Sequence, residues 1–137
     1  MSKFKVTYKG NFSTEMVHLE SGKKIITDAP KDNQGLGRTF SPTDLIASSL
    51  ASCMITIIAI AAKTHNIKIT EIDSDVKKKM SNTLPRKIAQ VDVNLNVFGN
   101  LDEKSQLIVK RSAKNCPVHH SLSKDMIINL KINFKTV

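Results

Sequence analysis

Residues 41–63 read SPTDLIASSLASCMITIIAIAAK, which predicts one long helix. Ser41 is suited to the N-cap, Pro42 to the first turn because it has no N–H to leave unpaired, and Asp44 to an acidic capping box. The rest is apolar on nearly every side, so the helix is expected to reach about Lys63 either inside a core or across a membrane. The run is near the lower limit of about 17 to 25 residues for a span, and strand-like segments flank it. A soluble core helix, covered with the help of a second subunit, is therefore favoured.

The segments on both sides of this helix alternate apolar and polar residues with the period of β-strands. A second helix is predicted at Glu103–Lys114, with Asp102 as its cap. The sequence therefore predicts a single α+β domain over residues 1–137, with antiparallel sheets packed around the long helix. The expected strands are Lys3–Tyr8, Met16–Leu19, Lys24–Thr27, Ile67–Met80, Lys87–Phe98 and Ile127–Phe134.

The chain carries 21 Lys and Arg against 12 Asp and Glu, a formal net charge of +9. This charge would attract nucleic acid, but the cations are scattered and the chain has one Tyr and no Trp to stack on bases. The basic residues are interpreted as a solvated face, and no nucleic-acid or membrane partner is expected. The N-terminus shows no pattern of a secretory signal, so the expected location is the cytoplasm.

Cys53 and Cys116 are the only two cysteines. In a reducing cytoplasm such a pair is better explained by a reversible or catalytic role than by a permanent disulfide, although two buried, inert thiols are the alternative. Cys116 precedes Pro117 and is placed to cap a short helix, whose amides lower a thiol pKa. Cys53 lies about three turns into its helix, beyond this effect, and needs activation from elsewhere.

Two segments, SPTDLIASSLASC at 41–53 and NCPVHHSL at 115–122, together resemble the two signature segments of the OsmC/Ohr family (osmotically inducible protein C and organic hydroperoxide resistance protein). The order of predicted strands and helices also agrees with this family over nearly the whole chain. The resemblance implies the OsmC-like fold, an intertwined α+β homodimer with the cysteines at the subunit interface.

For function, the resemblance implies a thiol peroxidase that reduces organic hydroperoxides in oxidative stress defence. Cys53 would be the peroxidatic cysteine, oxidised to a sulfenic acid, and Cys116 would resolve it as a disulfide. A lipoyl or small dithiol reductant would recycle the pair, and no cofactor is implied. The alternative is a non-catalytic OsmC-like protein with a role in stress or in binding a small ligand.

Peroxidases of the family activate the helix cysteine with an arginine after the first strand and a glutamate ten positions before the cysteine. Here the matching loop, Tyr8–Phe12, has no arginine and the matching helix position is Thr43. Arg38, in a loop expected to be flexible at Gly35 and Gly37, is the nearest substitute; its alternative role is a solvent or helix-end contact. Asp44 offers a nearby carboxylate, which is also the capping-box residue.

A metal site is the remaining alternative for the cysteines. Cys116 with His119 or His120, joined by Cys53, would supply ligands that suit zinc. A His119 that hydrogen-bonds backbone or tunes the Cys116 thiol is the favoured interpretation, so no metal is expected.

Overall fold

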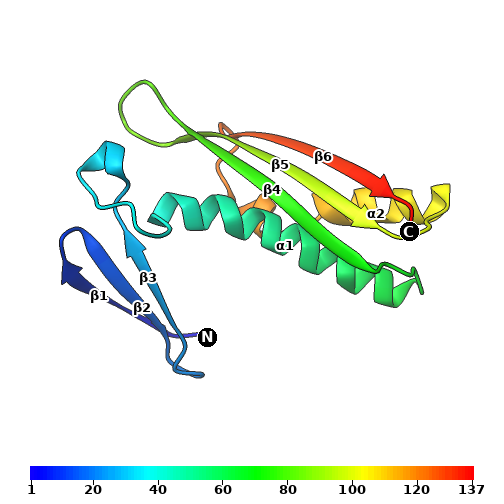
Figure 1. The fold of residues 1–137 in the computed structure, drawn as a ribbon, viewed down its shortest axis with the longest axis horizontal. Helices are drawn as coiled ribbons and strands as arrows, with labels where there is room; N and C mark the ends of the chain where they lie inside the picture. The colour runs from blue at the N-terminus through cyan, green and yellow to red at the C-terminus, as the bar shows by residue number, and fades with distance from the viewer. The chain divides into compact units, whose positions relative to one another are not determined.

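The computed structural model describes residues 1–137 as two compact units, Met1–Ile46 and Ala47–Val137 (Figure 1). The first unit contains an antiparallel sheet in the order β1-β2-β3. This sheet confirms the predicted three-stranded opening, and the expectation of a single domain stays a prediction. Its strands are β1 (Phe4–Gly10), β2 (Ser13–His18) and β3 (Lys24–Asp28).

The N-terminal sheet has one apolar face. The strand register places Phe4, Val6 and Tyr8 of β1 on the same side as Met16 of β2 and Ile25 of β3. The side chains of β1 on this face are 60–63% exposed within the chain. Exposed apolar patches of this kind mark surfaces that another molecule covers.

The loop between β3 and the long helix is closed by backbone hydrogen bonds. It contains a short 3₁₀ helix, η1 (Lys31–Asn33), and the N–H of Gly35 donates to the carbonyl of Pro30 at 2.9 Å. The N–H of Gly37 donates to the carbonyl of Ala29 at 3.2 Å. A Cβ at Gly35 would lie 1.7 Å from that same Ala29 oxygen. The glycines therefore permit close packing of this loop, and the expectation that they make it flexible stays a prediction.

The long helix, α1 (Pro42–Thr64), begins with the predicted capping box. The N–H of Asp44 donates to Ser41 Oγ at 3.1 Å, and the N–H of Ser41 donates to Asp44 Oδ2 at 2.9 Å. The helix ends at Thr64, and the chain turns at Asn66, whose φ is 55°, while the N–H of Ile67 donates to the carbonyl of Ala62 at 2.8 Å. Both predicted ends of this helix are confirmed to within about one residue.

The second unit is built on a sheet in the order β4-β5-β6, with α2 (Glu103–Lys114) and α3 (Pro117–Ser121) between β5 and β6. β4 and β5 are antiparallel, but β5 and β6 are parallel, which corrects the prediction of purely antiparallel sheets. The two helices form the crossover that a parallel connection requires, because a hairpin turn can join only antiparallel strands. The strands are β4 (Glu71–Met80), β5 (Ile88–Phe98) and β6 (Ile127–Lys135), so β4 begins four residues later than predicted.

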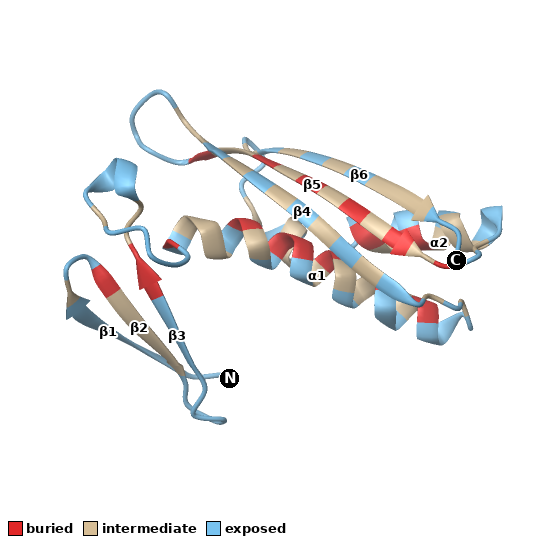
Figure 2. Cartoon of the chain, viewed as in Figure 1, coloured by how far each residue is buried: buried red, intermediate tan, exposed pale blue.

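The core lies between one face of this sheet and the helices (Figure 2). The inward side chains of β5 are all buried, and α1 and α2 pack against the same face. By length and composition α1 would also suit a membrane span, but its Leu50, Met54 and Ile58 are fully buried in this core. On its remaining surface Ile46 and Ile60 are 41% and 57% exposed, so α1 keeps an uncovered apolar side.

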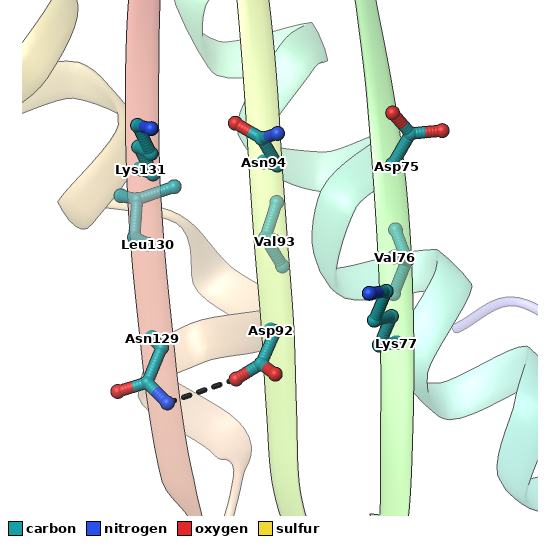
Figure 3. A pocket seen from close by; sticks show the side chains of 9 residues that line it. All are labelled: Asp75, Val76, Lys77, Asp92, Val93, Asn94, Asn129, Leu130 and Lys131. Carbon is teal, nitrogen blue, oxygen red and sulfur yellow. Dashed lines mark hydrogen bonds between the residues drawn. The ribbon is translucent and has the colours of Figure 1, made fainter.

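The outer face of the same sheet is polar. Lys77, Asp92 and Asn129 form one row across the three strands, and Figure 3 shows the amide of Asn129 directed at Asp92. Asn129 Nδ2 donates to Asp92 Oδ1 at 2.8 Å, and Gln90 Nε2 donates to the same oxygen at 2.9 Å. These two hydrogen bonds, with a smaller effect of Lys77, lower the pKa of Asp92. A charged, hydrogen-bonded row of this kind faces water rather than a core.

Candidate active site

The second unit brings Cys53 and Cys116 together. Cys53 lies in the middle of α1, half-buried at the margin of the core, and Cys116 is a fully buried member of it. The two thiols are reduced and lie close enough for Cys53 to affect the pKa of Cys116. The predicted meeting of two cysteines 63 positions apart in the sequence is therefore present in the structure.

Cys116 is the N-cap of α3, as the Cys-Pro dipeptide predicts. Pro117 occupies the first turn, and the N–H of His119 donates to the Cys116 sulfur at 3.4 Å. Burial nevertheless raises the pKa of the Cys116 thiol, and its interaction with the neighbouring Cys53 raises it further. The amides of His119 and Val118 act in the opposite direction without reversing the shift. Cys116 is thus a protonated thiol at neutral pH, while Cys53 is the more exposed of the two residues.

The two histidines of α3 are anchored to the end of α2. His119 Nδ1 lies 3.4 Å from the Lys114 carbonyl oxygen, and His120 Nε2 lies 3.1 Å from Asn115 Oδ1. Their rings stack with centroids 6.0 Å apart and an angle of 13° between planes. No group of three or more His, Cys, Asp or Glu side chains is arranged to hold a metal ion. The hydrogen bonds of the two histidines tie α3 to the end of α2, next to Cys116.

Arg38 lies in the first unit, where it pairs with Asp28 at the end of β3. Its Nε donates to Asp28 Oδ2 at 2.8 Å, its terminal Nη2 to Oδ1 at 2.9 Å, and its backbone N–H to Oδ2 at 2.9 Å. The hydrogen bonds from Arg38 lower the pKa of the buried Asp28 carboxyl to about 2, and Asp28 in turn raises the pKa of Arg38. The guanidinium side chain remains 59% exposed, so it is fixed on one side and open on the other.

Asp28 is the residue that sequence reasoning missed. Its only sequence signal is an acidic side chain at the last position of a strand, ten residues before an arginine, which is too common a pattern to predict a pair. Asp44, the other carboxylate considered, lies at the start of α1 and accepts the Ser41 N–H of the capping box. Both Arg38 and Asp44 belong to the first unit, and both cysteines to the second.

Comparison with known proteins supplies a family and several structures of the same fold. The sequence profile of the family described as OsmC-like protein matches residues 34–131. The chain is similar to a protein of Psychrobacter arcticus 273-4 that is provisionally described as an osmotic stress induced and detoxification response protein. The two share 45% identity over 96% of each chain, with a TM-score of 0.90. No curated protein matches the chain in sequence.

Two further solved structures share the fold at low sequence identity. An organic hydroperoxide resistance protein OsmC of Legionella pneumophila is 16% identical over 97% of this chain and 96% of that one, with a TM-score of 0.78. An organic hydroperoxide resistance protein of Elizabethkingia anophelis is 16% identical over the same shares of the two chains, with a TM-score of 0.75. These two likenesses concern the arrangement of the chain and not its chemistry.

Proposed function

We propose that this chain, which belongs to the OsmC-like protein family, is a cytoplasmic thiol peroxidase that reduces organic hydroperoxides. The observation that carries the proposal is the pair of neighbouring free thiols, Cys53 and Cys116. The names of the Legionella pneumophila and Elizabethkingia anophelis proteins, which refer to organic hydroperoxide resistance, support the same substrate class.

The proposed reaction uses the two thiols in sequence. The Cys53 thiolate attacks the outer oxygen of the hydroperoxide, the O–O bond breaks, and the leaving alkoxide takes a proton to become an alcohol. Cys53 is then a sulfenic acid. The Cys116 sulfur attacks the Cys53 sulfur, the S–O bond breaks, and hydroxide leaves with the Cys116 proton as water. The product is a Cys53–Cys116 disulfide, which a dithiol or lipoyl reductant returns to two thiols.

The different burial of the two sulfurs suits these roles. Cys53 is the more exposed, and therefore the first that a peroxide meets. Leu50, Met54 and Ile57 are among its neighbours on α1. An apolar substrate tail gains about 0.8 kcal/mol for each buried methylene group, which favours organic hydroperoxides over hydrogen peroxide. Cys116 stays protonated and inaccessible to external oxidants, so it is preserved for the resolving step.

Arg38 is proposed to supply the positive charge that stabilises the thiolate and the leaving alkoxide, with Asp28 holding its guanidinium in one orientation. Asp44 is proposed to contribute a carboxylate at the start of α1, besides its capping role. We expect Arg38→Ala to slow sulfenic acid formation by roughly tenfold. Lys31→Ala, which removes a cation from the same loop, is the control; equal rates in the two variants would assign Arg38 to the surface.

The proposed assembly is a homodimer. The apolar face of the N-terminal sheet and the exposed side of α1 leave Phe4, Tyr8 and Ile60 more than half exposed in a single chain. A second copy that covers these surfaces would stabilise the fold by mass action. Sedimentation at micromolar concentration should find a dimer, and a folded monomer under these conditions would exclude this assembly.

Counting thiols tests the enzymatic proposal directly. After one equivalent of cumene hydroperoxide, the wild-type protein should lose both free thiols, and peptide mapping should find Cys53 linked to Cys116. Cys53→Ser should keep its remaining thiol, whereas Cys116→Ser should accumulate sulfenic acid on Cys53. Sulfinic acid on Cys53 of the wild type with Cys116 unmodified would exclude the resolving role.

One observation favours a second function, a non-catalytic OsmC-like stress or ligand-binding protein. The exposed guanidinium of Arg38 is already neutralised by the buried Asp28. If the Asp28–Arg38 pair only holds its loop in place, Arg38 does not supply the positive charge that would activate Cys53. Full retention of both thiols in the hydroperoxide titration would establish this alternative over the peroxidase.

A further inference from the structure

The segment that surrounds Cys116 carries charges of one sign only. Residues 104–124 contain five cations and two histidines and no Asp or Glu. All five cations are exposed, whereas the outer face of the β4-β5-β6 sheet mixes lysines with aspartates. The cations are Lys104, Lys110, Arg111, Lys114 and Lys124.

This cationic surface has a fixed geometry. Lys104, Arg111 and Lys114 are spaced to share one side of α2, with the 45% exposed Leu107 among them. The hydrogen bonds of His119 to the Lys114 carbonyl and of His120 to Asn115 continue the surface onto α3.

A shallow cavity of about 410 Å³ adjoins it. Its lining includes His119, His120 and Lys124 together with the apolar Leu122 and Met126. The surface is therefore cationic and contains a cavity. The hydrogen bond from the N–H of His119 to the Cys116 sulfur connects it to Cys116.

We propose that this α2–α3 surface is the docking site of the protein that reduces the Cys53–Cys116 disulfide, and that this partner presents carboxylates around its dithiol. The proposal rests on the function proposed above, because only a redox cycle needs such a partner. Charge complementarity selects the partner: a cationic surface raises the association rate of an acidic one about 10- to 1,000-fold and repels a basic one.

The chemistry that docking promotes is disulfide exchange. One thiolate of the partner attacks the more exposed Cys53 sulfur, the Cys53–Cys116 bond breaks, and Cys116 leaves as a thiolate that takes the proton given up by the second partner thiol. The second partner thiol loses its proton and attacks the mixed disulfide, which releases Cys53 and leaves the partner oxidised. The thiolates that attack and leave are anions, so the same positive potential favours both steps.

Two other interpretations of this surface fit its features less well. A merely solvated basic face would not need the anchored histidines and the apolar hollow beside them. Nucleic acid would need stacking platforms, but residues 104–124 contain no Tyr, Trp or Phe. A protein partner with a mixed apolar and acidic contact fits both features.

The test uses two synthetic peptides that share a Cys-x-x-Cys core and carry either four Glu or four Lys around it. The disulfide of the full chain is made with diamide, so no hydroperoxide is involved, and its reduction is followed at low salt. We expect the Glu peptide to react about tenfold faster than the Lys peptide, with the ratio falling toward one at about 0.5 M NaCl. Binding of the same peptides with Ser in place of Cys, measured by fluorescence anisotropy, should show the same preference without any redox step.

Charge-reversal variants separate a local surface from the net charge of +9. Arg111→Glu with Lys114→Glu should abolish most of the Glu-peptide preference in rate and in binding. Lys79→Glu with Lys131→Glu, which changes the net charge equally on the outer sheet face, should leave it nearly intact. Equal losses in the two double variants, or no preference in the wild type, would overturn the docking site. A Glu preference that persists in a chain unreactive toward hydroperoxides would uphold the docking site and refute the peroxidase.

Discussion

Replacing Gly35 with alanine should destabilise the protein although Gly35 is not in a left-handed conformation. The new Cβ would lie 1.7 Å from the carbonyl oxygen of Ala29 and 2.1 Å from its carbon, and backbone atoms cannot rotate away as a side chain can. The loop must open, which breaks the hydrogen bonds from Gly35 to Pro30 and from Gly37 to Ala29. At about 1 kcal/mol for each bond, the expected loss is about 2 kcal/mol in the free energy of unfolding.

Urea denaturation measures this loss, and a thermal melt should show a midpoint lowered by about 7 °C for a chain of this length. Gly10→Ala is the matched control, because Gly10 has a φ of +87° but no atom within 4 Å of its added Cβ. That variant carries only the conformational cost of a left-handed alanine, about 1 kcal/mol. A Gly35→Ala protein no less stable than Gly10→Ala would refute the close packing of the loop.

Three further predictions concern the pair Asp28–Arg38, the core and the thiols. Because the pKa of Asp28 is lowered from 3.8 to about 2, its pairing stabilises the protein above pH 3.8 and is lost as pH falls toward 2. The difference in melting temperature between wild type and Asp28→Asn should therefore shrink over this range, and a constant difference would contradict it. Leu95→Ala, in the fully buried row of β5, should cost about 3 kcal/mol in urea denaturation, whereas a loss below 1 kcal/mol would mean a poorly packed site. Iodoacetamide at pH 7 should label Cys53 well before the buried, high-pKa Cys116, and comparable labelling of the native protein would show that Cys116 is accessible.

The predictable parts of this fold are those with local causes. Ser41 and Asp44 stand at capping-box spacing, and the hydrogen bonds between them join residues only three positions apart. Cys116 before Pro117 likewise predicts the start of a helix. The alternating residues of β5 show their buried face directly in the sequence. In each case the signal and the structure it predicts lie within one element.

The features that were not predicted depend on contacts between residues far apart in the sequence, or on the room that the backbone has for close packing. Nothing in the alternation of Ile127–Lys135 tells whether that strand runs parallel to β5, because the direction depends on how the crossover returns the chain. The pairing of Asp28 with Arg38 depends on how the intervening loop closes, and the loop closes as it does because Gly35 leaves room for Ala29. The proximity of Cys53 to Cys116 was predicted from the family resemblance and not from any local sequence pattern.

The capping role of Cys116 ties the order of a helix to an oxidation state. α3 has only five residues, and a helix so short does not persist in water by itself. One of its few constraints is the N–H of His119 held by the Cys116 sulfur. A sulfur engaged in a disulfide is a poorer acceptor, and its position is set by its covalent partner rather than by the helix. If Cys53 and Cys116 cycle between thiols and a disulfide as proposed, α3 would be held less tightly in the oxidised protein, and the surroundings of His119 and His120 would change with the redox state of the buried Cys116 sulfur.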